Sequence, residues 1–221
     1  MKLLLSGLVK YICGLVLVGA LVFWPAGTWA FWRGWLFMGL LFVPMLAVGF
    51  VMFFKDPQFL AKRLDAKEKQ TEQKSVLGAS AVMFIGGFLV AGLDRRFGWS
   101  NVPVWVTVVA AALFLLAYGL YGEVMRENAY LSRVIRVEQG QQVVDTGLYA
   151  LVRHPMYMAT LVLFLMMPLV LGSWYALMVF AAYPAIIIIR LKAEEELLTR
   201  ELPGYLEYKQ KVKYRLIPYI W

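Results

Sequence analysis

The sequence predicts an all-α protein that crosses a membrane about six times. Of its 221 residues, 62% are hydrophobic and 15% are aromatic, and the mean hydropathy of +0.68 is far above that of a soluble domain. Residues 156–189 form a run of 34 positions without a charge. One helical span needs only about 20 apolar residues, so this run is long enough to cross twice. These features predict a polytopic membrane protein built as one domain, residues 1–221.

Four further spans are expected before this run, at residues 3–24, 31–54, 76–93 and 102–121. The first span follows Lys2 as a signal peptide would, but it is long and lacks an Ala-x-Ala cleavage site with a polar sequel, which favours a retained span. Lys10 lies inside it and either extends toward the membrane surface or lines a cavity.

The uncharged run carries a turn signal at its centre, Gly172-Ser173-Trp174. A helix over 155–171 and another from 174 to about 194 would each be about 25 to 30 Å long at 1.5 Å per residue. Their polar ends then lie on one side of the membrane. Residues about 40 positions apart in sequence are therefore expected to come into contact.

Positive charge predicts the orientation of the chain. With a cytoplasmic N-terminus, 18 of the 22 Lys and Arg residues lie on the cytoplasmic side, and only Arg33, Arg95 and Arg96 lie opposite. Both termini are therefore expected in the cytoplasm. Topology and attraction to anionic membrane lipids explain the net charge of +8, so no nucleic acid is expected as a partner.

The domain then divides into four parts: four N-terminal spans (1–121), a cytoplasmic loop and motif (122–155), a helical hairpin (156–190) and a cytoplasmic interfacial helix (191–221). The loop 55–74 is expected to carry its own helix, starting at Asp56-Pro57. The C-terminal part is predicted to be amphipathic and interrupted at Pro203-Gly204, because its apolar residues recur every three or four positions, at Leu198, Leu202, Tyr205, Tyr208 and Val212.

Arg126 and Asn128 follow directly on the fourth span. They belong either to a positively charged collar at the membrane surface or to a site for a lipid head group or substrate, and the sequence favours neither.

Two polar clusters flank the hairpin. Pro155 suits the first position of a helix, whose free N–H groups and the adjacent Arg153 would favour an anion. Glu194, Glu195 and Glu196 are expected near a helix end, where they need a compensating cation. A ligand with both a carboxylate and a fixed positive charge would satisfy both clusters. His154 is the only histidine and Cys13 the only cysteine, so no metal site built on several such residues and no internal disulfide is expected.

These clusters carry a resemblance to a known family. Arg153-His154-Pro155-Met156-Tyr157, then Glu194-Glu195, then Tyr205-Leu206-Glu207-Tyr208 are similar to the signature of the isoprenylcysteine carboxyl methyltransferase family and its phospholipid methyltransferase relatives. Gly147-Leu148-Tyr149 also fits the family pattern. The resemblance is strong over about 143–212 and weak elsewhere.

The resemblance implies a membrane methyltransferase that uses S-adenosyl-L-methionine in a cytoplasmic pocket and acts on a lipidic or prenylated acceptor, such as a prenylcysteine carboxylate. It implies catalytic roles for Arg153 and Glu195. The expected substrate-binding residues are Arg126 and Asn128, and the expected cofactor-binding residues are Gly147, Leu148, Tyr149, His154, Pro155, Tyr157, Glu194, Glu195, Tyr205 and Tyr208.

Other functions remain open from the sequence. One is N-methylation of a phospholipid amine, for which His154 or Glu195 would serve as the base. Another is a membrane sterol or enone reductase that uses NADPH. A transporter or channel has little support, because the spans lack paired acids at the depth of the membrane centre.

Overall fold

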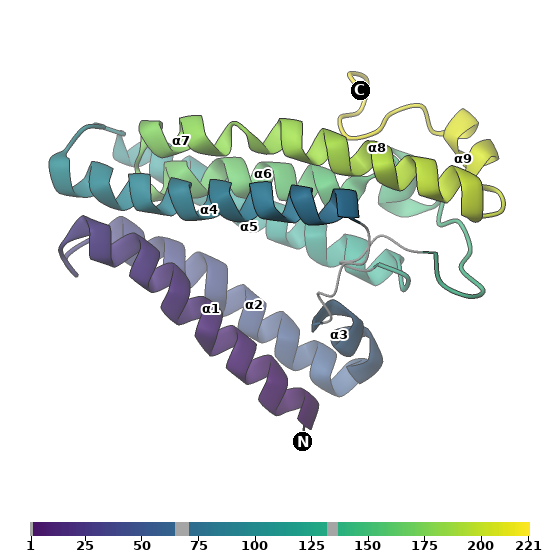
Figure 1. Cartoon of the computed structure of the whole chain (residues 1–221), viewed down its shortest axis with the longest axis horizontal. Coiled ribbons are helices and arrows are strands. Elements are labelled where there is room, and N and C mark those ends of the chain that lie inside the picture. The colour runs from purple at the N-terminus through teal and green to yellow at the C-terminus, as the bar shows by residue number, and fades with distance from the viewer. Residues whose placement is uncertain (1, 65–70, 132–136) are drawn as a thin grey trace.

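The computed structural model describes residues 2–64, 71–131 and 137–221, and in these ranges every regular element is a helix. In chain order the elements are α1 (Lys2–Ala26), α2 (Trp32–Lys55), α3 (Pro57–Leu64), α4 (Thr71–Phe97), α5 (Val104–Glu127), the 3-10 turn η1 (Gly147–Ala150), α6 (Pro155–Leu171), α7 (Trp174–Phe180), α8 (Tyr183–Glu201) and α9 (Tyr205–Lys211) (Figure 1).

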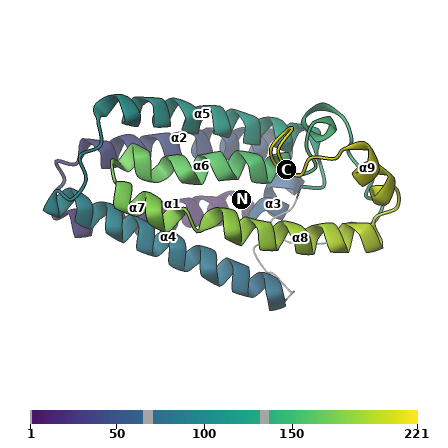
Figure 2. The same ribbon diagram turned by 90° about the horizontal axis from the view of Figure 1, so that it is seen from above.

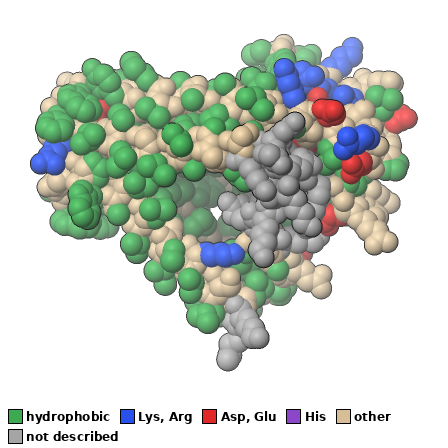
Figure 3. Space-filling view, viewed as in Figure 1, with side chains coloured by type: hydrophobic (Ala, Val, Ile, Leu, Met, Phe, Trp, Pro, Cys, Tyr) green, Lys and Arg blue, Asp and Glu red, His purple; other side chains and the backbone are tan. Residues whose placement is uncertain are grey.

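Five stretches of helix are long and apolar enough to cross a membrane: Leu3–Ala26, Trp32–Lys55, Ser75–Phe97, Val104–Glu127 and Trp174–Glu201. The helix Pro155–Leu171 is apolar but shorter. Figure 3 shows hydrophobic side chains over most of the left of one face, whereas charged side chains gather at the right, over α8 and α9. The predicted all-α polytopic membrane fold is confirmed.

The helices form a bundle with a divergent N-terminal hairpin. Figure 1 shows α4, α5, α6 and the α7–α8 pair side by side, while α1 and α2 slope away from them. Seen from above in Figure 2, α6 lies between α5 and α7–α8. Four aromatic rings on four helices meet in the core. The ring centroid of Phe88 is 5.5 Å from that of Phe37 and 5.7 Å from that of Phe180. The centroids of Phe37 and Phe114 are 6.3 Å apart.

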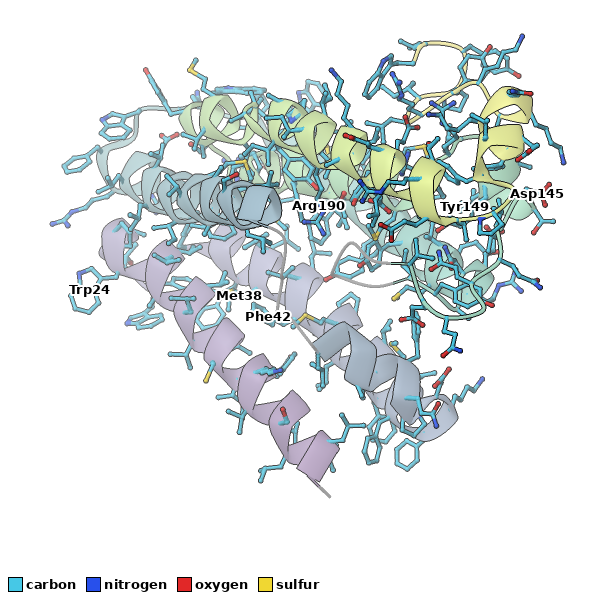
Figure 4. All side chains as sticks on the ribbon, turned by 45° about the vertical axis from the view of Figure 1, so that its right-hand side comes forward. Trp24, Met38, Phe42, Asp145, Tyr149 and Arg190 are labelled. Carbon is cyan, nitrogen blue, oxygen red and sulfur yellow. The ribbon has the colours of Figure 1, made fainter. Side chains whose placement is uncertain are left out.

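The two N-terminal helices touch through small residues. A side-chain carbon built on Gly19 would lie 3.6 Å from Met38, and one on Gly14 would lie 3.8 Å from Phe42. Figure 4 shows Met38 and Phe42 where the two helices meet. The Tyr11 ring packs edge-on against Phe42. An added carbon at either position would make an ordinary van der Waals contact, so both glycines of α1 face α2 at this level of the hairpin.

The turn between α6 and α7 lies where the sequence predicted it. Gly172 has a φ of 78°, which favours glycine, and the Ser173 hydroxyl accepts a hydrogen bond of 3.0 Å from the backbone N–H of Ala176. The returning span predicted from residue 174 is present but divided, because α7 ends at Phe180 and α8 begins at Tyr183. Pro184 explains the break, since it has no N–H to donate to the carbonyl of Phe180 and its ring crowds that carbonyl.

Several predicted boundaries shift. The fourth span continues to Glu127, and α8 continues to Glu201, so Glu194 lies about two turns before the helix end. The interruption predicted at Pro203-Gly204 is confirmed, and Gly204 has a φ of 82°. The helix expected to begin at Asp56-Pro57 is α3, whose Asp56 carboxylate accepts a hydrogen bond of 2.9 Å from the N–H of Phe59.

Candidate functional site

A pocket with a cavity volume of about 90 Å³ lies at the end of the bundle where α6 begins and α8 and α9 lie close together. Its walls come from the end of α5, the segment before α6, α6 itself, α8 and α9. The lining residues are Asn128, Tyr130, Leu131, Gln141, Gln142, Val143, Val144, Tyr149, Arg153, His154, Pro155, Met156, Tyr157, Arg190, Glu194, Leu198, Leu202, Tyr205 and Tyr208. Figure 4 shows Tyr149 beside α9 and Arg190 beneath α8. The hairpin and the C-terminal segment therefore meet at one cavity.

The end of α5 fixes the short turn η1. Both carboxylate oxygens of Glu127 accept the backbone N–H of Leu148, at 3.0 and 3.2 Å. Asn128 donates a hydrogen bond of 2.9 Å to the hydroxyl of Tyr149. Gly147 has a φ of 55°, and a side-chain carbon there would collide with the Glu127 carboxylate. Glycine is therefore required at 147 by the backbone and by the close approach of Glu127.

The start of α6 is tied to the C-terminal segment through the backbone. The N–H of Arg153 donates to the carbonyl of Tyr214, and the N–H of His154 donates to that of Arg215, both at 2.9 Å. The Arg153 guanidinium adds bonds to the carbonyls of Val212 at 2.7 Å and Lys213 at 3.0 Å. The motif thus joins the hairpin to the residues that follow α9.

Glu195 is buried among three basic side chains. One carboxylate oxygen lies 2.6 Å from Arg153 Nε and 3.3 Å from His154 Nε2, and the other lies 3.1 Å from Arg215 Nε. Its side chain is only 5% exposed, and Glu195 is not among the residues that line the pocket. It sits where removal of one charge would leave the others buried and unbalanced. The compensating cation expected for the acidic run is therefore Arg153.

Glu194, one position earlier, faces the pocket. It accepts a hydrogen bond from the Tyr157 hydroxyl, which in turn accepts one of 3.1 Å from Arg190 Nε. Arg190, Glu194 and Leu198 are four residues apart on α8 and form one stripe of the pocket wall. Neighbouring residues of an α-helix differ by about 100° in direction, which separates Glu194 from Glu195.

Two tyrosines of α9 complete the wall. The Tyr208 hydroxyl donates to the carbonyl of Tyr149 at 2.8 Å. The Tyr205 hydroxyl is buried and has no hydrogen-bond partner within the described part of the chain. Burial raises the pKa of the Tyr205 phenol above its usual range, and the negative charges of Glu195 and Glu194 raise it further. Tyr205 is therefore a neutral, unused donor at the pocket.

Most of the residues expected at the site line this pocket. They are Asn128, Tyr149, Arg153, His154, Pro155, Tyr157, Glu194, Tyr205 and Tyr208. Gly147, Leu148 and Glu195 lie outside the lining. They contact residues that hold it in place: Glu127 for Gly147 and Leu148, and Arg153 and His154 for Glu195. Arg126 is also outside it, because its exposed side chain pairs with Glu123 at 2.5 Å.

Three residues that the sequence did not single out contribute to the site. Arg190 lines the pocket, Glu127 holds η1, and Arg215 pairs with Glu195. Arg190 precedes Glu194 by four residues, and this helical spacing was a usable signal. Nothing in the sequence pattern pairs Glu127 with Leu148 or Arg215 with Glu195, because these contacts depend on the path of the loops.

The pocket wall carries groups of both charges, which suits a small polar ligand that has both a positive and a negative group. A carboxylate, two arginines, a histidine, two glutamine amides, an asparagine amide and several tyrosine rings surround it. Among the described residues, no group of three or more His, Cys, Asp or Glu side chains is placed to hold a metal ion.

Comparison with known proteins gives the class. The family model for phospholipid methyltransferase matches residues 105–203, which cover α5 to the end of α8 and include both Arg153 and the acidic run. No curated protein matches the chain. Fold and match together support an integral-membrane methyltransferase.

More particularly, residues 105–203, a little under half of the chain, are similar to phospholipid methyltransferases. The predicted resemblance is confirmed over this segment.

Proposed function

We propose that this protein is a methyltransferase that binds S-adenosyl-L-methionine in the pocket at the start of α6. The observation that carries the proposal is the pairing of a pocket-facing acid, Glu194, with the unused buried hydroxyl of Tyr205. A buried hydroxyl without a partner costs free energy, and a ligand that accepts its hydrogen bond would remove that cost.

The donor set fits this cofactor. S-adenosyl-L-methionine carries a positively charged sulfur, an ammonium, a carboxylate, ribose hydroxyls and an adenine ring. Glu194 supplies negative charge, Asn128, Gln141 and Gln142 supply amides, and Tyr149 and Tyr157 supply aromatic surface. We propose Tyr149, His154, Pro155, Tyr157, Glu194, Tyr205 and Tyr208 as the residues that contact the cofactor.

Arg153 and Glu195 have different roles, because only Arg153 is placed to contact a ligand in the pocket. Arg153 lines the pocket, whereas Glu195 holds Arg153 and His154 from behind. We propose that Glu195 is a positioning residue for Arg153, and that Gly147 and Leu148 serve the same purpose for Tyr149. When bound, the cofactor supplies an activated methyl group. The protein then has to orient the acceptor and exclude water, and orientation alone can supply much of the rate.

The proposed acceptor is a lipidic or prenylated amphiphile that reaches the pocket from the membrane. The match to phospholipid methyltransferases makes a phospholipid head group one acceptor to test, and a prenylcysteine carboxylate is the other. Asn128 lines the pocket and remains a candidate for acceptor binding, whereas Arg126 points to Glu123. Incubation with labelled cofactor and separate phospholipid-amine and prenylcysteine substrates distinguishes N-methylation from O-methylation by the product.

Binding in detergent tests the cofactor. S-adenosylmethionine or S-adenosylhomocysteine at about 100 times its dissociation constant should stabilise the protein by about 2.7 kcal/mol. Thermal unfolding with each adenosyl ligand and with NADPH separates the two enzyme classes. A shift with NADPH and none with the adenosyl ligands would reject the proposal in favour of a reductase.

We also propose that both termini are cytoplasmic, on the basis of the charge distribution. The test replaces Cys13 and introduces one cysteine, either at Gln210 or at Asn101. A membrane-impermeant reagent should label the Gln210 probe from the cytoplasmic side and the Asn101 probe from the opposite side. Asn101 is preferable to its neighbour Ser100, whose backbone and hydroxyl both bond to Asp94. Labelling of both probes from one side would contradict this topology.

A further inference from the structure

A second pocket, of about 300 Å³, lies between α1, α2 and α3 and shares no lining residue with the first. Figure 1 shows α3 beside the end of the α1–α2 hairpin. The lining is apolar except for Lys10 and the Tyr11 hydroxyl, and consists of Leu3, Leu4, Gly7, Leu8, Lys10, Tyr11, Met45, Leu46, Gly49, Phe50, Phe53, Leu60 and Leu64. Both long helices have the length and composition of membrane spans, so this pocket opens among lipid chains.

Lys10 is the one charged residue among the described residues that line this pocket. It lies eight positions into α1, about 12 Å along the helix axis from Lys2. Its ammonium donates a hydrogen bond of 2.6 Å to the carbonyl of Leu64, at the end of α3. An ammonium has three N–H donors, and a neutral carbonyl balances none of its charge. Within a membrane span such a charge favours an anionic partner.

The shape of the pocket admits a chain. Tyr11 closes one end, because its ring packs edge-on against Phe42 and its hydroxyl donates to the Phe42 carbonyl at 3.2 Å. Gly49 lies in the wall, and a side-chain carbon built on it would meet no atom within 4 Å. The side chains of Leu46 and Phe50 remain 47% and 62% exposed. Space along α2 is therefore left open between apolar walls.

We propose that this pocket binds one anionic phospholipid, with its phosphate on Lys10 and one acyl chain between α1 and α2. An acyl chain fills the apolar space and restores the dispersion contacts that empty walls lack. Since lipid tails surround the protein anyway, the chain alone provides no preference between lipids. Preference comes from the charge on Lys10, so the occupant carries a net negative head group. This site is independent of the proposed cofactor pocket.

Native mass spectrometry in detergent tests the site. The purified protein is mixed with equal amounts of phosphatidylglycerol and phosphatidylcholine that have the same acyl chains, and the retained lipids are counted. We expect wild type to retain the anionic lipid roughly fivefold in excess, the ratio that one lysine near a lipid head group supplies. Lys10→Gln should bring the ratio close to one, and Lys10→Arg should keep it.

Control variants separate the effect of the Lys10 charge from the effect of the pocket volume. Lys55→Gln removes an exposed charge at the end of α2 that does not line the pocket, and should leave the ratio unchanged. Gly49→Leu fills the pocket and should lower retention of both lipids. Gly39→Leu, also on α2 and facing open space outside the pocket, should behave as wild type.

The outcomes are decisive in either direction. An unchanged lipid ratio in Lys10→Gln, or equal retention of the two lipids by wild type, would overturn the proposal. So would wild-type retention in Gly49→Leu. Thermal unfolding of each variant shows that the comparison is made between folded proteins, and Lys10→Arg provides the charge test should Lys10→Gln unfold.

Discussion

The two ends of the bundle both bury a carboxylate, but they use it differently. At the end with the α6–α7 turn, Asp94 is 2% exposed and accepts bonds from neutral donors only: the N–H and hydroxyl of Ser100, each at 2.6 Å, and the hydroxyl of Ser173. At the other end, about 25 Å away along α6, Glu195 is held by basic side chains, and its neighbour Glu194 faces an open pocket.

The difference separates a structural acid from a binding acid. Asp94 joins α4 to two loops through Ser100 and Ser173, which are structural partners. Glu195 plays the same joining role between α6, α8 and the C-terminal segment. Of these three acids, Glu194 is the one that lines the pocket at the start of α6, together with the motif residues. The comparison teaches that burial and charge alone do not identify a ligand site, and that the set of residues sharing the pocket wall with the acid, here Arg153, His154 and Tyr205, is what distinguishes Glu194.

The largest expected effect follows from breaking the Glu195 cluster. Glu195→Gln leaves Arg153 buried without its counter-charge, and the free energy of unfolding should fall by about 3 to 5 kcal/mol. Thermal or denaturant unfolding in detergent measures this. Glu196→Gln, an exposed neighbour, should change stability by less than about 0.5 kcal/mol. Equal stability of Glu195→Gln and wild type would refute the structural role.

Removal of the carboxylate at the opposite end should have the next largest effect on stability. Asp94→Ala leaves the Ser100 and Ser173 hydroxyls without their acceptor and should cost about 2 to 3 kcal/mol. Affinity for S-adenosylhomocysteine should stay within about twofold of wild type, because the change is remote from the pocket. Asp56→Ala, which removes an exposed cap of α3, is the control and should cost about 1 kcal/mol. A large loss of affinity in Asp94→Ala would mean that the two ends are coupled.

Glu194→Gln sharpens the comparison, because it should affect binding more than stability. Loss of a charge-assisted contact should weaken binding of an adenosyl ligand roughly ten- to a hundredfold. The control Glu201→Gln, on the same helix and outside the pocket, should change affinity by less than about twofold. Calorimetric titration gives both values. If Glu194→Gln binds as tightly as wild type, Glu194 is not part of the ligand site.

The smallest expected effect distinguishes two tyrosines of α9. Tyr205→Phe removes a hydroxyl that lacks a partner, so the ligand-free protein should be as stable as wild type or slightly more so, while ligand affinity falls about five- to tenfold. Tyr208→Phe removes a made bond to Tyr149 and should cost about 1 kcal/mol of stability. Because the pKa of Tyr205 is raised, its hydroxyl stays protonated and its contribution to affinity should be constant from pH 7 to about pH 9. A loss of stability in Tyr205→Phe would assign it a structural role.

The sequence located the parts of the site better than their arrangement. Spacing predicted the turn at Gly172 and the first residue of α6, because small turn formers and a proline restrict the backbone locally. Pro184 marks the place of the break before α8, but whether a proline inside a span bends the helix or ends it is decided by the helices packed around it. Arg133 and Arg136, counted as cytoplasmic charges, lie outside the described residues.

The sequence by itself determined an apolar helical protein, a hairpin whose polar ends meet, and the set of residues that gather there, because hydrophobic length and helix periodicity are local properties of a chain. Tertiary structure alone decided which acid faces the pocket and which is enclosed by Arg153, His154 and Arg215. Glu194 and Glu195 are chemically identical in sequence. Their different surroundings arise from the direction in which each leaves α8 and from the path of the C-terminal segment, and neither can be read from composition or spacing.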